Sequence, residues 1–422
     1  MINKNKFIPI VILLLLVCGN AFGQHLFAPG LCETHILSSD NGYTVFFLYR
    51  VPYNRFVFIK DGDVYKAGFR INIEVADSNS RHVTRQIDEK SFTVDKYEET
   101  NSNDSYFEGI CKFSLAGGKY HLSPSITDLN STKELKFPDI QIEHDTIRNK
   151  DFISPFIVYH DQVKCGNNSF YKLTNFNGSI PFGKASCDFI IPVADTKLSS
   201  IYALLISNRD TVYNGEVKES FNAGLMPGEC DGNIILKTGD SIKSTKNFII
   251  KNFSRTLDEG ALRLVLSKDN KFSNQFTANM DVKWFNKPFS LLIPADAIKL
   301  LKYIEKGTVI DSLLDFSKDE YEKVLTNYWK KYDADSRTKF NPLMDEYYSR
   351  IDYAMKNFSA LSEKNGAATD RGKTYIKYGT PKKIERSSSA DGKMIERWIY
   401  PNSDLVFEFI DQNGAGNYTF KK

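Results

Sequence analysis

Beyond Cys230 the chain contains neither histidine nor cysteine, because all six histidines lie before residue 161. Catalysis by a histidine-assisted nucleophile, or a zinc site with imidazole or thiolate ligands, is therefore excluded from the C-terminal region. The patterns HExxH, GxSxG, the P-loop and GxGxxG are also absent. We predict no metal site and no cofactor, and we expect ordinary surface or strand positions for the histidines, which are His25, His35, His82, His121, His144 and His160.

The chain has one long apolar run, residues 7–17, which is too short to cross a bilayer because a spanning helix needs about 20 residues. Two lysines precede the run and small residues follow it, so residues 1–23 are predicted to be a secretory signal peptide. The mature chain should begin near Gln24, have no transmembrane helix, and reach the periplasm or the cell surface. A lipid anchor at Cys18 is an alternative that the bulky Val17 before it disfavours.

A strong excess of charge of one sign is also missing. The formal net charge is +3, and the basic residues are scattered along the chain. A nucleic-acid partner would call for a basic stripe, and an exported protein would not meet nucleic acid. We therefore expect no nucleic-acid binding.

Five cysteines follow the predicted signal peptide, and their odd number leaves at least one unpaired. Export permits disulfides, and Cys165 could pair with either Cys187 or Cys230. Cys111 alternates with Phe113 on the inward side of an expected strand, which is typical of a buried free thiol. The chain has no CxxC pair, so metal or redox use of cysteine is not expected.

Two β-rich regions follow the signal peptide, at residues 24–145 and 146–252. In the first, apolar residues at 69, 71, 73 and 75 alternate with polar ones, as in a strand with one buried face. Short apolar segments separated by turn residues continue through both regions without long helical patterns. We predict two immunoglobulin-like β-sandwiches, and hence a multidomain, mainly β chain.

Residues 253–422 are predicted to form a connector and an α+β domain with its core at 290–422. A helix over residues 321–332 places Val324, Leu325, Tyr328 and Trp329 on one face. Ser317 and Glu320 have the spacing of a capping box. A second helix should begin at Asn341-Pro342, with Leu343 in its apolar stripe. Strands are predicted at residues 374–378, 394–400 and 405–410.

The loop before the first of these strands contains Thr369, Asp370 and Arg371 between Gly366 and Gly372. Threonine and aspartate can cap a chain reversal, so a structural role is favoured. Alternatively, Asp370 and Arg371 form an ion pair or a fork that binds a ligand. Two tyrosines off the apolar stripe of the second helix, Tyr348 and Tyr353, are candidates for surface contact.

The sequence of this region resembles that of the GWxTD domain family of bacterial envelope proteins. Gly366, Thr369 and Asp370 match its signature, whereas Ala367 stands where the family has tryptophan. The similarity covers about the last third of the chain. It includes Tyr328-Trp329, the aromatic-rich second helix and the turn Gly379-Thr380-Pro381. The resemblance implies a domain of this family and a location in the cell envelope, and it implies no activity. Structural roles are predicted for Gly366, Gly372, Gly379, Pro381 and Trp329.

These observations predict an exported, non-catalytic binding or scaffold protein whose partner is an envelope protein or a glycan. The alternative is a hydrolase of polysaccharide or peptide that uses two C-terminal carboxylates at a suitable separation. Glu396 and Glu408 alternate with apolar residues on expected strands, so we expect both to face solvent.

Overall fold

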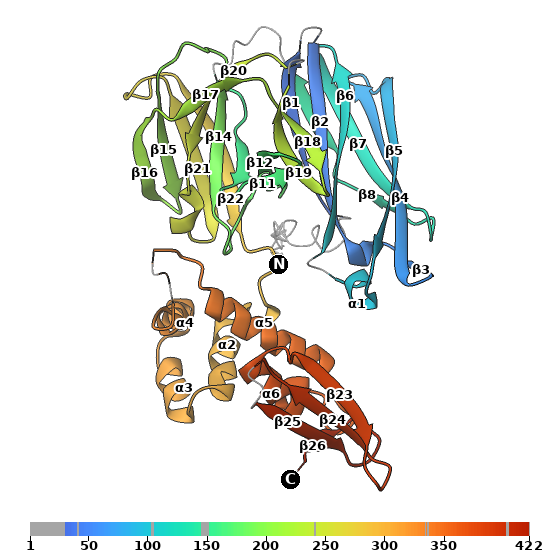
Figure 1. Cartoon of the computed structure of the whole chain (residues 1–422). Helices are drawn as coiled ribbons and strands as arrows, with labels where there is room; N and C mark the ends of the chain where they lie inside the picture. The colour runs from blue at the N-terminus through green and yellow to red at the C-terminus, as the bar shows by residue number, and fades with distance from the viewer. Residues whose placement is uncertain are drawn as a thin grey trace, which may run out of the picture. The chain divides into compact units, whose positions relative to one another are not determined.

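The computed structural model describes residues 30–421, apart from residues 40–41, 103–104, 145–151, 240–241, 334, 336 and 402–404. The predicted signal peptide, the start at Gln24, Cys18 and the boundary at residues 145/146 lie outside the described residues. The described chain is mainly β, with antiparallel sheets and a small C-terminal sheet (Figure 1). No helix among the described residues is both long enough and apolar enough to cross a membrane. By its internal contacts the chain divides into two compact units.

The first unit comprises Met1–Lys150, Asn175–Asn177 and Gly224–Lys243. Its smaller sheet has the order β1 (Leu31–Ser39), β2 (Gly42–Pro52) and β6 (Tyr106–Leu115). In the larger sheet, β4 (Val64–Asp77) pairs with β5 (His82–Val94) on one side and with β7 (Gly118–Asp128) on the other. The shorter elements are η1 (Tyr53–Arg55), β3 (Ile59–Asp61), α1 (Tyr97–Thr100), β8 (Glu134–Lys136), β9 (Ile140–His144), β18 (Leu225–Cys230) and β19 (Asn233–Thr238).

Side chains from both sheets of this unit form one core. Phe69, Ile71 and Ile73 of β4 are fully buried beside Phe47 and Tyr49 of β2. The predicted alternation along β4 is therefore confirmed. The burial of these side chains fixes the register, since a shift by one residue would turn them all to solvent.

The second unit comprises Asp151–Thr174, Gly178–Ala223 and Ser244–Lys422. One of its sheets has the order β10-β14-β20-β17, and another the order β13-β22-β21-β15-β16. Apolar residues from both sheets share a core. The strands are β10 (Phe156–Tyr159), β11 (Val163–Cys165), β12 (Asn168–Lys172), β13 (Ile180–Pro181), β14 (Cys187–Val193), β15 (Ile201–Ser207), β16 (Asp210–Val217), β17 (Ser220–Ala223), β20 (Thr245–Ile250), β21 (Gly260–Ser267) and β22 (Gln275–Lys283), and η2 spans Phe253–Thr256.

The C-terminal part of this unit packs helices beside a four-stranded antiparallel sheet, β23-β24-β25-β26 (Figure 1). Its elements are η3 (Phe289–Leu291), α2 (Pro294–Leu300), η4 (Leu301–Tyr303), α3 (Gly307–Leu314), η5 (Lys318–Glu320), α4 (Tyr321–Lys330), α5 (Pro342–Asn357), η6 (Gly366–Ala368), α6 (Asp370–Tyr378), β23 (Lys383–Ser388), β24 (Met394–Ile399), β25 (Val406–Asp411) and β26 (Tyr418–Phe420).

The two aromatic helices agree with the sequence pattern. Val324, Leu325, Tyr328 and Trp329 are the buried residues of α4. The side chain of Asn341 caps α5 by accepting hydrogen bonds from two backbone N–H groups in its first turn. The expected capping box is wrong, because Ser317 donates to the Glu320 side chain (2.5 Å) and makes no side-chain cap. Leu343, predicted in the apolar stripe of α5, is 46% exposed.

The predicted strand at residues 374–378 is also wrong, because these residues form the end of helix α6. Gly372 and Ile376, which are buried, lie four residues apart and therefore on one helical face. In a segment of only five residues, a helix and a strand can bury the same positions. The pattern of apolar residues therefore does not distinguish the two. The strands predicted at residues 394–400 and 405–410 are confirmed as β24 and β25 within one residue at each end.

The cysteines fall into two groups. Cys165 and Cys230 are disulfide-bonded, whereas Cys187 is a buried free thiol, so Cys187 is not the partner of Cys165. Cys111 is a buried free thiol, as predicted, and burial raises its pKa to about 12.

Candidate functional site

Thr369 begins helix α6. Its hydroxyl donates to the carbonyl oxygen of Gly366 (2.7 Å) and accepts from the backbone N–H of Gly372 (3.0 Å). A Cβ on Gly366 would collide with the carbonyl oxygen of Ala354, and a Cβ on Gly372 would collide with that of Gly366. The backbone therefore comes too close at both positions for a larger residue.

The two residues after Thr369 connect α6 to the sheet. Asp370 accepts a hydrogen bond from the backbone N–H of Phe420 in β26 (3.0 Å). The Arg371 guanidinium contacts the carboxylate of Glu396 in β24 (3.3 Å) and lies 4.1 Å from the centre of the Tyr418 ring. Asp370 and Arg371 do not pair with each other in any contact of the described residues. Asp370 instead binds β26, and Arg371 contacts both β24 and β26.

Glu396 is buried, at 4% exposure, so the prediction that it faces solvent is wrong. It lies two residues before the buried Trp398 and therefore on the same face of β24. Arg371, Arg386 and the indole N–H of Trp398 all donate to its carboxylate. Glu408 is partly exposed and pairs with Lys421 (3.0 Å).

The two candidate tyrosines have different surroundings. Tyr348 is fully buried, and its hydroxyl donates to the carbonyl oxygen of Ala297 in α2 (2.8 Å). The expected surface position of Tyr348 is therefore wrong, because α2 covers this side of α5. Tyr353 is 47% exposed and its ring stacks on that of Tyr375 at 4.5 Å.

The remaining predicted structural residues lie at turns or in the core. Trp329 is 2% exposed in the helical core, and Ala367, at the family's tryptophan position, is fully buried in the same cluster. Gly379 has a φ of 77° and ends α6, and its carbonyl oxygen accepts from the Tyr400 hydroxyl (3.0 Å). Pro381 follows in the turn before β23.

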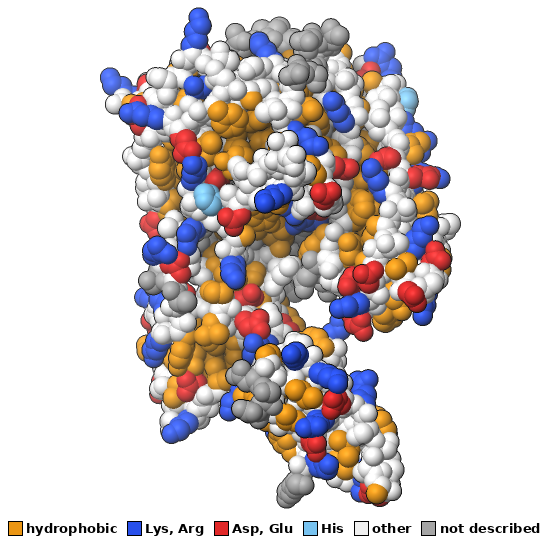
Figure 2. Space-filling view, viewed as in Figure 1, with side chains coloured by type: hydrophobic (Ala, Val, Ile, Leu, Met, Phe, Trp, Pro, Cys, Tyr) orange, Lys and Arg blue, Asp and Glu red, His pale blue; other side chains and the backbone are white. Residues whose placement is uncertain are grey.

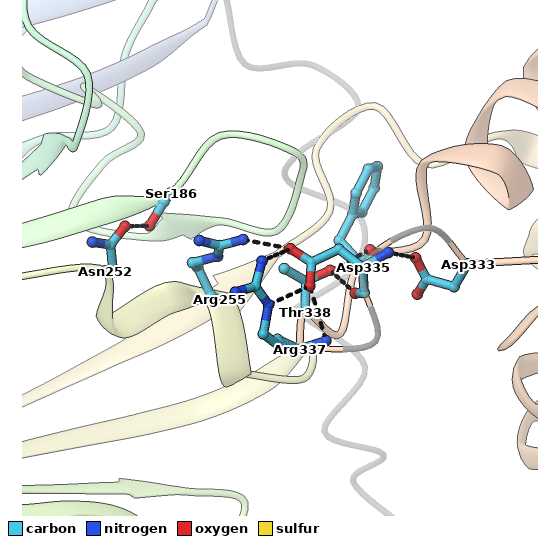
Figure 3. A network of polar contacts seen from close by, with 8 residues as sticks. Ser186, Asn252, Arg255, Asp333, Asp335, Arg337 and Thr338 are labelled. Atoms are coloured by element: carbon cyan, nitrogen blue, oxygen red, sulfur yellow. Dashed lines mark hydrogen bonds and ion pairs between the residues drawn. The ribbon is translucent and has the colours of Figure 1, made fainter.

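A second polar cluster was missed by the sequence reasoning. Arg255 of η2 donates to Asp335 (2.7 Å), and Arg337 contacts both oxygens of the same carboxylate, as Figure 3 shows. The hydrogen bonds from Arg337 are the main reason why the pKa of Asp335 is lowered to about 2. Asp333 accepts from the backbone N–H of Asp335 (3.0 Å). The acidic and basic residues that precede α5, at positions 333, 335, 337 and 339, could have predicted an ion-pair cluster in this loop.

A chain of hydrogen bonds runs from Asp188 through His160 and Asn252 to Ser186. The fully buried carboxylate of Asp188 faces Nδ1 of His160 (2.9 Å) and accepts from the backbone N–H of Asn252 (2.7 Å). Since a carboxylate only accepts, Nδ1 carries the proton and Nε2 is an acceptor for the Asn252 amide (3.4 Å). The Ser186 hydroxyl donates to the other end of that amide (2.8 Å, Figure 3).

Both clusters reach one pocket of about 250 Å³ in the second unit. Three segments line it: residues 182–186 before β14, two residues of η2, and the stretch from the end of α4 to the first residue of α5. The lining residues of the last stretch are Asp333, Asp335, Thr338, Phe340 and Pro342. The polar side chains in its wall are those of Lys184, Ser186, Ser254, Arg255, Asp333, Asp335 and Thr338. Phe182 and Phe340 add aromatic surface.

The helices and the four-stranded sheet after residue 290 define a small α+β domain, with Thr369 and Asp370 at the junction of helix and sheet. Residues 265–421 match the family model of the GWxTD domain, so the chain contains a GWxTD domain. The resemblance seen in the sequence is thus confirmed. A comparison with curated proteins found no match.

Proposed function

We propose that the protein is an exported, non-catalytic binding or scaffold protein of the cell envelope, and that the pocket described above is a binding site. The observation that carries this proposal is the chain Asp188–His160–Asn252–Ser186, which ends in the pocket wall. The chain contains the serine, histidine and aspartate of a serine hydrolase. The asparagine between histidine and serine, however, holds the serine hydroxyl in place without making it a nucleophile.

A serine nucleophile needs a base that takes its proton. Ser186 donates to the amide oxygen of Asn252, and an amide does not take up a proton at neutral pH. Nε2 of His160 faces the nitrogen end of the same amide and not the Ser186 hydroxyl. The hydrogen bonds therefore orient the hydroxyl for recognition, which supports binding over hydrolysis.

Three carboxylates of the C-terminal domain support the same conclusion. Glu396 is neutralised by two arginines, and Asp370 accepts from the backbone of β26. Glu346 pairs with Arg350 within helix α5 (2.6 Å). Each is held in a structural contact, whereas a general acid needs to be within hydrogen-bonding reach of its substrate.

Export and architecture belong to the same proposal. The run at residues 7–17 supports a signal peptide, and paired antiparallel sheets that share a core in each unit support immunoglobulin-like sandwiches. On the face in Figure 2, acidic and basic side chains are interspersed, which fits a partner other than nucleic acid. An envelope protein or a glycan is the proposed partner.

Binding to fractions of the cell envelope tests the proposal. The mature chain is compared with Ala185→Trp, which fills the pocket, and with Ala194→Trp, an equally exposed alanine outside the pocket wall. We expect a component that the unaltered chain and Ala194→Trp retain and that Ala185→Trp loses. Equal retention by all three proteins would refute the pocket as the binding site.

A further inference from the structure

The pocket wall presents hydrogen-bonding groups with fixed roles. The Ser186 proton is used in the bond to Asn252, so only the lone pairs of its oxygen remain for a ligand. Ser254 is occupied by Cys187, because its oxygen accepts from the backbone N–H of Cys187 (2.8 Å) and its side chain also hydrogen-bonds the side chain of Cys187. Thr338 donates to backbone oxygens of its own loop. A complementary ligand therefore carries a hydroxyl that donates to Ser186.

The charges of the pocket favour an anion. The charge of Asp335 is compensated by contacts to Arg255 and Arg337. Lys184 makes no hydrogen bond or ion pair within the described part of the chain, and it lies in the pocket wall. Two cations of the wall, Lys184 and Arg255, face two carboxylates, Asp333 and Asp335, and Arg337 contacts Asp335 from outside the wall. Since three cationic groups then stand against two carboxylates, one positive charge remains for a ligand. Asp333 keeps one carboxylate oxygen outside its turn contact, which suits a second ligand hydroxyl.

The size of the pocket limits the ligand to about one ring. Its volume of 250 Å³ lies below the range of about 300–1,000 Å³ that is usual for drug-sized ligands. The rings of Phe182 and Phe340 pack against each other at 5.5 Å and supply the apolar part of the wall. An apolar ring face beside fixed polar groups suits a sugar, whose C–H face packs on aromatic rings while its hydroxyls form hydrogen bonds.

We infer that the pocket binds an acidic sugar residue, a ring with hydroxyl groups and one carboxylate or phosphate. This inference rests on the proposed binding function and adds the chemical class of the ligand. The anionic group contacts Lys184 and the free N–H groups of Arg255. A ring hydroxyl donates to Ser186. An acidic peptide would supply the charge but no hydroxyl donor for Ser186.

Ligand-observed and protein NMR on the mature chain test the inference. The probes are methyl glucuronide, methyl glucoside as its neutral counterpart, glucose 6-phosphate, inorganic phosphate and a short glutamate peptide. We expect methyl glucuronide or glucose 6-phosphate to bind at least tenfold more tightly than methyl glucoside and to shift signals of the pocket residues. Whichever of the two binds more tightly identifies the anionic group as carboxylate or phosphate.

Variants distinguish the pocket from other surfaces. Lys184→Ala should weaken the acidic sugar at least tenfold and leave the neutral one unchanged, because Lys184 contacts only the anion. Lys197→Ala is the control, an exposed lysine of the same unit outside the pocket wall. Ser186→Ala should weaken both sugars by a similar factor, since its acceptor faces a hydroxyl common to both.

The inference is overturned if methyl glucoside binds as tightly as methyl glucuronide, if phosphate alone or the peptide competes equally, or if Lys184→Ala has no effect. It is overturned in the same way if no probe binds. None of these results removes the proposed binding function, which is decided separately by the comparison of Ala185→Trp with Ala194→Trp. If the sugar probes fail these tests and Ala185→Trp also retains the envelope component as well as Ala194→Trp does, both proposals are rejected.

Discussion

Removing the Glu396 carboxylate should destabilise the GWxTD domain strongly. Its side chain is 5% exposed and that of Arg371 is 13% exposed, so Glu396→Ala leaves a nearly buried guanidinium without its anion. Breaking one partner of a buried ion pair costs roughly 3–5 kcal/mol. The contact is 3.3 Å long and Nε of Arg371 has no acceptor within the described residues, so we expect the lower end, about 3 kcal/mol.

Arg386 provides the matched control, because it contacts the other oxygen of the same carboxylate (3.0 Å) with a side chain that is 68% exposed. Exposed pairs contribute about 1 kcal/mol or less, so Arg386→Ala should have a small effect. The double variant Arg371→Met/Glu396→Leu removes both buried charges and should recover much of the loss.

Urea denaturation followed by tryptophan fluorescence measures these differences. The three tryptophans, Trp284, Trp329 and Trp398, all lie within the residues that match the GWxTD domain, so the signal reports on that part of the chain. If Glu396→Ala and Arg386→Ala lower the unfolding free energy equally, or if neither changes it, the structural role of this junction is refuted.

Three further predictions concern other contacts. In an NMR titration, Arg337→Ala should raise the pKa of Asp335 from about 2 towards its usual 3.8, and an unchanged pKa would contradict the contact. The stabilisation that the ionised carboxylate provides is present above pH 3.8 and is lost as the pH falls through 2. Thr369→Val should cost about 1 kcal/mol by removing the cap of α6, and Thr369→Ser should restore it, as measured by denaturation; equal stability of both variants would exclude the cap. The buried free thiols are those of Cys32, Cys111 and Cys187, and burial raises the pKa of each to about 12. Alkylation at pH 8, followed by mass spectrometry, should therefore leave all three unmodified until the chain unfolds. Modification of any of them in the folded protein would contradict their burial.

Local signals predicted much of the GWxTD domain. The apolar stripe of α4 and the Asn341-Pro342 start of α5 depend on residues close together in the chain, and both are confirmed. The cap at Thr369 also lay in the sequence, but the five residues before Gly379 matched strand and helix patterns alike, so α6 was predicted as a strand.

The burial of Glu396 and the pocket could not be read from local patterns. Glu396 is buried because arginines from α6 and β23 reach it, which depends on how helix and sheet pack. The pocket joins segments about 70 and 150 residues apart in the chain, and the roles of its hydroxyls follow from contacts that only the fold creates. Spacing within one segment carries no information on such contacts.

The central claim is that the protein binds an envelope component and leaves it chemically unchanged. The most direct test is to incubate the mature chain with the envelope component that it retains and to compare the mass of that component before and after by mass spectrometry. The account predicts that the component is recovered intact and that its retention depends on an open pocket. Release of hydrolysis products by the unaltered chain, lost in Ser186→Ala, would contradict it.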